Sequence, residues 1–231
     1  MTSPLGPVPR TRSELLSRWA QLVPEHPELG SGLLRRWCEP HRDYHGPIHL
    51  AHGLAVLDHL EAGPVEYLAW WYHDAVHTNT TPDDELASGR LAAEELAGVV
   101  PDHDVAEVVR LVELTISHSP ALDDRAGQRL CDADLAMVAL DADAYRDQVQ
   151  RLRNERDGLD AATWDRLRIS FTGRMLNRET LFHTPWAQHH LSAAARRNLS
   201  HERDQLLSGT ATPTSPRSPQ PWLQNDSETE A

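Results

Sequence analysis

The chain has 231 residues, a formal net charge of −13 at pH 7 and 14 histidines, and all of its 22 basic residues are arginines. The missing lysine excludes Schiff-base chemistry, a phosphate-binding P-loop lysine and a Ser-Lys pair, because each needs an ε-amine. The acidic balance argues against a nucleic acid polymer or a membrane surface as partner, and no stretch approaches the roughly 18 apolar residues of a membrane span, so we expect a cytoplasmic protein.

The two ends of the chain lack the pattern of a folded core. Residues 1–11 contain three prolines and no apolar run, which predicts a flexible leader rather than a signal peptide. Residues 208–231 are rich in proline, serine and threonine, which is typical of a disordered tail. We expect residues 12–207 to form one domain, in which Cys38 and Cys131 are buried thiols because they lie in no metal-type or redox-type spacing.

Between these ends the apolar spacing is helical nearly everywhere, and no alternating run of β-branched residues predicts a strand. The pattern predicts an all-α helical bundle of about nine or ten helices. In chain order these predicted helices are 12–22, 29–38, 47–62, 64–77, 83–98, 103–118, 128–139, 141–157, 160–178 and 186–207.

The predicted helix 47–62 carries histidines on different faces. On a helical wheel His49 falls inside the apolar stripe, whereas His52 and His59 fall at its edge and are expected at the surface. His45 precedes the helix on the approach loop. An imidazole on an apolar face is usually a hydrogen-bonded core residue, and for His49 taken alone this structural interpretation is favoured.

The predicted helix 64–77 is apolar on all sides from residue 68 to residue 76, which indicates a helix that is buried almost completely. It contains His73 and Asp74 as neighbours. Burying an ionised carboxylate without a partner is costly, so Asp74 is expected to face a cation or a donor, and a divalent metal ion is the natural one.

The predicted helix 128–139 supplies two further carboxylates. Asp134 lies on the same side as the apolar residues and is expected to face inward, whereas Asp132 is expected to face outward or to cap the helix. Together with the two imidazoles and Asp74, Asp134 would complete a mixed nitrogen and oxygen ligand set. Such a set suits Mn, Fe, Co, Ni or Zn, with Mg also possible, and leaves positions open for water and substrate.

The order of these residues resembles the HD superfamily of metal-dependent phosphohydrolases, and more closely a bacterial subgroup described only as predicted HD phosphohydrolases. The resemblance covers roughly residues 12–207. It rests on Tyr44-His45, His49-Leu50, the run from Trp71 to Val76, Asp84-Glu85 with Ser88, the run from Asp132 to Leu135, and the segment from Arg178 to Thr184. It implies His49, His73, Asp74 and Asp134 as metal ligands, with one ion expected rather than two.

The resemblance also bears on catalysis. Related nucleotidases and guanosine-tetraphosphate hydrolases carry an acidic residue about three positions after the His-Asp pair, whereas Ala75 to Thr78 follow it here. Asp74 is expected to hold the metal and to take a proton, and the activation of water would pass to His77 or to Glu85. His77 fits equally well as a buried residue with a purely structural hydrogen bond.

Several basic residues are candidates for substrate contacts. His45 and His118 could contact substrate or act as extra ligands, in which case two metal ions would be bridged by Asp74. The arginines could bind a substrate phosphate or form surface ion pairs of little consequence, and Arg42 is the best placed of them. These arginines are Arg42, Arg90 and Arg174.

We therefore predict a metal-dependent phosphohydrolase that acts on a phosphomonoester or phosphoanhydride, such as a nucleotide or a similar small phosphorylated metabolite, and that could form an oligomer. One alternative is a two-iron oxygenase, which requires both His45 and His118 as ligands. Another is a non-catalytic nucleotide-sensing module, which the missing acidic residue after Asp74 keeps open. A plain helical interaction protein would leave the inward-facing carboxylates unexplained.

Overall fold

The computed structural model describes residues 8–156 and 158–210 of the chain. Within these ranges all regular secondary structure is helical, and one isolated bridge between Ala97 and Val100 is the only β-type pairing. The prediction of an all-α helical bundle is therefore confirmed. The predicted flexible leader and disordered tail lie largely outside the described residues.

The described part of the chain contains eleven α-helices and one short 3-10 helix. Their bounds are α1 (Arg12–Leu22), α2 (Pro27–Trp37), α3 (Pro47–His59), α4 (Pro64–Tyr72), α5 (Asp83–Leu96), α6 (Asp102–Leu114), α7 (Arg125–Leu135), η1 (Ala136–Ala139), α8 (Ala142–Asn154), α9 (Ala161–Leu176), α10 (Pro185–His190) and α11 (Ser192–Ser208). None of these helices is both long and apolar enough to cross a bilayer.

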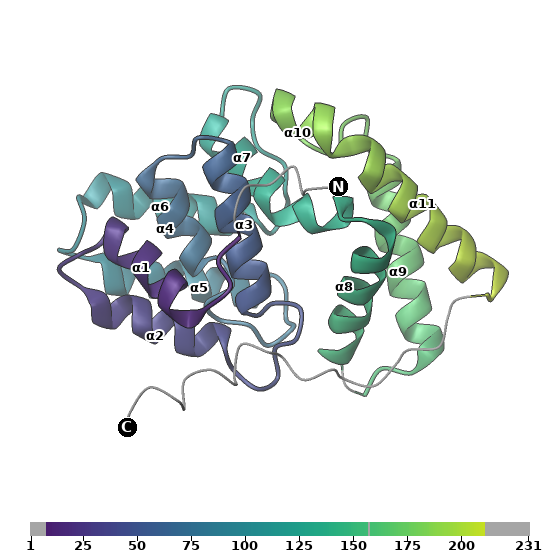
Figure 1. Ribbon diagram of the computed structural model, residues 1–231, viewed down its shortest axis with the longest axis horizontal. Helices are drawn as coiled ribbons and strands as arrows, with labels where there is room; N and C mark the ends of the chain where they lie inside the picture. Colours follow the sequence, from purple (N-terminus) through teal and green to yellow (C-terminus); the bar gives the residue numbers. More distant parts are fainter. Residues whose placement is uncertain (1–7, 157, 211–231) are drawn as a thin grey trace.

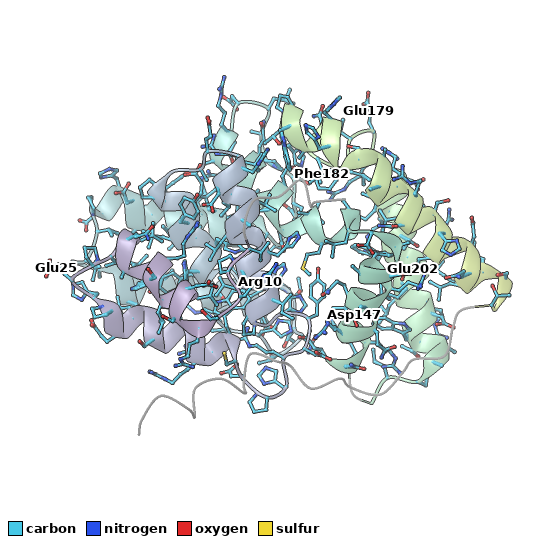
Figure 2. All side chains as sticks on the ribbon, viewed as in Figure 1. Arg10, Glu25, Asp147, Glu179, Phe182 and Glu202 are labelled. Atoms are coloured by element: carbon cyan, nitrogen blue, oxygen red, sulfur yellow. The ribbon has the colours of Figure 1, made fainter. Side chains whose placement is uncertain are left out.

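The helices fall into two groups (Figure 1). Helices α1 to α7 pack together on one side, and α8, α9 and α11 stand on the other, with α10 along the upper edge. The 3-10 helix η1 contacts α3 and α7 as well as α8 and α11, so it connects the groups. A buried ion pair between Arg168 and Glu202 joins α9 to α11, and Figure 2 shows Glu202 beside α8 and α9.

Tryptophans fill the space around α3 and α4. Trp37 and Trp70 are fully buried, and their indole nitrogens donate to the carbonyl oxygens of Trp71 at 3.0 Å and Leu50 at 2.8 Å. Gly53 of α3 allows α4 to come this close, because a Cβ atom there would lie 1.9 Å from Cζ2 of Trp70. The indole of Trp70 thus sets the register between the two helices that carry the predicted histidine ligands.

Three predicted helices differ clearly from the observed ones. The predicted helix 128–139 is divided into α7 and the 3-10 helix η1. Helix α4 ends at Tyr72 rather than at residue 77, so Asp74 lies in the turn after the helix and not within it. The apolar pattern continues past Tyr72 because the turn is itself covered by neighbouring helices, and apolar spacing alone does not separate a buried turn from a buried helix. The predicted helix 186–207 is divided at Leu191 into α10 and α11.

His52 was predicted at the surface, and Asp132 was predicted to face outward or to cap its own helix, but both are buried. His52 is 8% exposed and Asp132 is 0% exposed. Asp132 accepts hydrogen bonds at 2.7 Å from the backbone N–H groups of His183 and Thr184, directly before α10. It therefore stabilises the start of a helix more than fifty residues further along the chain, which a wheel of its own helix cannot indicate.

Candidate metal centre

Two imidazoles meet between α3 and the end of α4. His73 lies 2.8 Å from the carbonyl oxygen of Trp70 through Nδ1, so this nitrogen carries the proton and Nε2 presents its lone pair. On α3, His49 faces the sulfur of Met137 through Nδ1 at 3.3 Å. The two Nε2 atoms then lie 3.3 Å apart, and both side chains are 1% exposed.

Two carboxylates complete the group. Asp74 Oδ2 lies 3.1 Å from Nε2 of His73, and Asp134 Oδ1 lies 3.2 Å from Nε2 of His49. The structure thus brings together all four predicted ligands, from α3, the end of α4 and α7. We call His49, His73, Asp74 and Asp134 the four-residue centre.

The four-residue centre favours a bound positive charge. Burial lowers the pKa of His73, but the neighbouring Asp74 carboxylate outweighs burial, and the pKa rises to about 9. Burial likewise works against ionising Asp74, yet the surrounding imidazoles, His73 foremost, hold its pKa below the usual range. His49, His73 and Asp74 each place one ligand atom within 4.8 Å of the others, and they could hold a divalent transition metal. Asp134 adjoins this group through Oδ1, which lies 3.2 Å from Nε2 of His49.

His118 supports the four-residue centre from the loop after α6. Its Nε2 lies 2.6 Å from Asp134 Oδ2, whereas His49 and His73 face the other carboxylate oxygen, Oδ1. Burial opposes the ionisation of Asp134, but the hydrogen bonds from His118 and His49 keep its pKa well below the usual value. His118 is thus placed as a partner of a candidate ligand, and Arg178 holds its backbone through a hydrogen bond of 3.3 Å.

Arg42 has a different position from the predicted one. Its guanidinium donates to the carbonyl oxygen of Asp74 at 2.5 Å and to that of Ala75 at 3.1 Å, and it pairs with Glu39 at 3.0 Å. The side chain is 0% exposed. Contrary to the prediction of a phosphate contact, Arg42 is enclosed and orients the backbone of Asp74.

The structure does not bring Glu85 into contact with the four-residue centre. Its Oε1 accepts a hydrogen bond from Thr81 at 2.9 Å. The preceding residue, Asp84, is the buried one, and it accepts from the backbone N–H groups of Thr78 at 2.7 Å and Thr80 at 2.9 Å. Asp84 therefore fixes the loop between α4 and α5, a role that its acidic helix-start position alone does not reveal.

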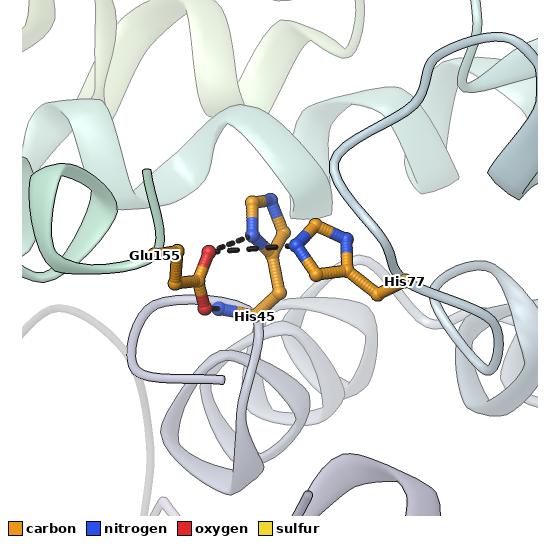
Figure 3. Close-up of side chains that lie close together, drawn as sticks. All are labelled: His45, His77 and Glu155. Atoms are coloured by element: carbon orange, nitrogen blue, oxygen red, sulfur yellow. Dashed lines mark hydrogen bonds and ion pairs between the residues drawn. The ribbon is translucent and has the colours of Figure 1, made fainter. Parts of the chain in front are cut away.

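His45 and His77 belong to a second group, centred on Glu155 at the end of α8 (Figure 3). His45 Nδ1 lies 2.6 Å and His77 Nε2 3.5 Å from Oε2 of Glu155. Sequence reasoning missed Glu155, because it ends an amphipathic helix and carries no local motif. We call His45, His77 and Glu155 the Glu155 cluster.

A cavity of about 350 Å³ adjoins both groups. Asp134, His118 and His45 contribute to its lining. Most of the remaining wall is apolar and comes from η1, α8 and α9, with Met137, Val138, Val149, Leu152, Trp164 and Phe171 among its residues. Three arginines also line it, namely Arg156, Arg168 and Arg174.

Of the predicted phosphate-binding arginines, Arg174 lines this cavity and Arg90 does not. Arg90 is exposed on α5. Arg156 and Arg168 were not predicted, because nothing in the local pattern distinguishes them from surface arginines on amphipathic helices. Arg168 is bound to Glu202, whereas Arg174 is exposed on α9.

Comparison with known proteins adds no relative to these observations. No family model, no curated protein and no solved structure matches the chain.

Proposed function

We propose that the chain is a metal-dependent phosphohydrolase of the HD type, acting on a phosphomonoester or phosphoanhydride such as a nucleotide. One observation carries the proposal: the four-residue centre converges in a buried place and presents Asp134 to a cavity lined by arginines. The residue order that resembles the HD superfamily is the second support.

The residues of the four-residue centre have the donor types that a divalent transition metal prefers. When bound there, such an ion supplies a Lewis acid for a phosphoryl oxygen and lowers the pKa of a water molecule. Arg42 fixes Asp74 through the backbone, and His118 fixes Asp134 through its second oxygen. Hydrogen bonds of this kind hold ligand side chains in one orientation before the ion binds.

The cavity suggests how substrate is held. Arg174 is exposed, donates to Ser170 at 2.7 Å, and has further N–H groups suited to bidentate binding of phosphate. The aromatic and aliphatic wall, with Trp164 and Phe171, suits a substrate whose remaining part is apolar or aromatic, as a nucleobase is. A small phosphorylated metabolite with such a group is therefore the proposed substrate class.

Proton transfer is assigned to His118 in this proposal. Neither predicted candidate, His77 or Glu85, contacts the four-residue centre within the described residues. His118 lines the cavity and donates to Asp134, so it lies within reach of a group bound beside that carboxylate. Asp74 keeps its proposed role as a ligand.

The oxygenase alternative requires His45 and His118 as ligands of two bridged ions. His45 is directed at Glu155, in a group that does not include Asp74, and His118 pairs with Asp134. Two ions bridged by Asp74 are therefore not favoured, and hydrolysis is the better supported reaction. The sensing module shares the same centre and differs only in turnover.

A phosphatase screen tests the proposal. Chelator-treated protein is assayed for phosphate release from nucleoside mono- and diphosphates with added Mn²⁺, Co²⁺, Ni²⁺, Zn²⁺ or Mg²⁺. We expect metal-dependent release that Asp134→Asn lowers by about 100-fold or more, while His103→Gln at an exposed site on α6 leaves it unchanged. Nucleotide binding without turnover under all metals would contradict hydrolysis and support the sensing module.

A further inference from the structure

We propose that the Glu155 cluster binds a second divalent transition-metal ion, separate from the four-residue centre. The inference is independent of the phosphohydrolase proposal, because it rests on different side chains. Figure 3 shows both imidazoles directed at the same carboxylate. One ligand atom from each of the three residues lies within 4.8 Å of the others.

Glu155 is held as a ligand would need to be. Its Oε1 accepts three backbone N–H groups of the loop before α3, from Asp43 at 2.7 Å and from Tyr44 and His45 at 2.8 Å. These bonds satisfy one oxygen completely and leave Oε2 directed at the imidazoles. The side chain is 0% exposed, so the carboxylate cannot turn to solvent for a partner.

His77 supplies the second, independent observation. Its side chain is 7% exposed, and Nε2 is a buried nitrogen with no hydrogen-bond partner among the described residues. The carboxylate oxygen Oε2 of Glu155, at 3.5 Å, is farther than a normal hydrogen bond, and burying such a nitrogen is unfavourable unless a further group binds it. His41 also helps to hold His77 in place, because its Nε2 contacts the backbone carbonyl oxygen of His77 at 2.8 Å and the two rings are parallel.

His45 completes the set and indicates how the ion would enter. Its ring centroid lies 4.1 Å from that of His77, and Nδ1 donates to Glu155 Oε2 at 2.6 Å. Two ligands of one tetrahedral zinc ion lie about 3.3 Å apart, which follows from metal–nitrogen and metal–oxygen bonds of about 2.0–2.2 Å. The 3.5 Å between His77 and Glu155 matches that spacing, and His45 reaches it by releasing its proton and withdrawing slightly.

Two imidazoles and one carboxylate form the ligand set of zinc sites that keep a fourth position open, and also of Fe(II) sites with a facial triad. Zn²⁺ binds with two neutral histidines, so the ion would replace the proton between His45 and Glu155. Because His45 also lines the cavity, the open position would lie close to the ligand that the cavity binds.

The test is zinc binding to the full chain after removal of metals with a chelator. Equilibrium dialysis should find two Zn²⁺ ions on the wild-type protein and one on His77→Gln. One ion should likewise remain on Asp134→Asn, and none on the double variant. His103→Gln, at a side chain that is 82% exposed, is the matched control and should keep both ions.

Crystals of the wild-type chain grown with Zn²⁺ locate the ion directly, so this test does not depend on whether a variant folds. Anomalous scattering at the zinc edge should give a peak between His45 Nδ1, His77 Nε2 and Glu155 Oε2. A map with zinc at the four-residue centre or at surface histidines only, and none in the Glu155 cluster, would overturn the proposal. Two ions retained by His77→Gln would overturn it as well.

Discussion

The guanidinium of Arg42 donates a hydrogen bond of 2.5 Å to the carbonyl oxygen of Asp74 and another of 3.1 Å to that of Ala75. A fully enclosed cation thereby holds the backbone of a candidate metal ligand in the turn after α4. An arginine fork binds two carbonyl groups in a fixed geometry that a single ammonium cannot reproduce.

Arg42→Lys should therefore weaken metal binding while keeping the charge. We expect the affinity for Mn²⁺ to fall about 10- to 100-fold, as is typical when a group that orients a ligand is lost. At saturating metal, KM for a phosphorylated substrate should stay within about twofold of wild type, because orientation of a ligand is not substrate binding. Calorimetric titration and steady-state kinetics measure these quantities. A raised KM with unchanged metal affinity would instead show that Arg42 binds substrate.

Because His52 is buried, we expect the free energy of unfolding to decrease in mild acid. Burial, aided by repulsion from His49, lowers the pKa of His52 to about 4 in the folded chain, against about 6.5 when unfolded. As the pH falls through this interval the unfolded chain takes up the proton first, so the free energy of unfolding decreases, by an amount of order 3 kcal/mol in total. Above pH 6.5 this contribution is fully present.

The pH dependence can be measured by urea unfolding of three proteins between pH 7 and pH 4.5. His52→Gln should lose less stability over this range than wild type. His59→Gln changes an exposed histidine of the same helix and should follow the wild-type curve. Parallel curves for wild type and His52→Gln would show that His52 is not the group that titrates.

The close packing of α3 against α4 at Gly53 leaves no room for a larger side chain there. A Cβ atom there would meet the indole of Trp70, which is itself fixed by its hydrogen bond to Leu50. Gly53→Ala should therefore lower the free energy of unfolding by about 1–3 kcal/mol or more. In α2, the nearest atom to a Cβ at Gly32 is the flexible end of Arg35 at 3.7 Å, so Gly32→Ala should be neutral or stabilising. Equal losses from both substitutions would contradict the close contact.

The helical fold could be predicted because apolar spacing repeats along the chain. The four-residue centre could be predicted because its members are polar residues set within apolar stretches of sequence. The end of α4 could not be predicted, since the carbonyl groups of Asp74 and Ala75 beyond it accept hydrogen bonds from the distant side chain of Arg42. Arg42 is separated from these two residues by 32 and 33 positions in the sequence, so no local pattern indicates the interaction.

The role of Glu155 was even harder to predict from the sequence, because it too depends on contacts with residues far away in the chain. Glu155 contacts the loop before α3 across about 110 residues, and its own helix gives it the pattern of an ordinary polar end residue. His77 was predicted from its spacing to His73, one helical turn away, but the helix ends before it. Its true neighbours, His45 and Glu155, come together only through tertiary packing.

The four-residue centre is tested most directly by calorimetric titration of Mn²⁺ into the chelator-treated chain. His49→Gln removes a candidate ligand from α3, and His59→Gln changes an exposed histidine at the end of the same helix. We expect wild type and His59→Gln to bind the ion equally, and His49→Gln to bind it at least about 100-fold more weakly. Unchanged affinity in His49→Gln, or no binding by wild type, would contradict a metal centre at these residues.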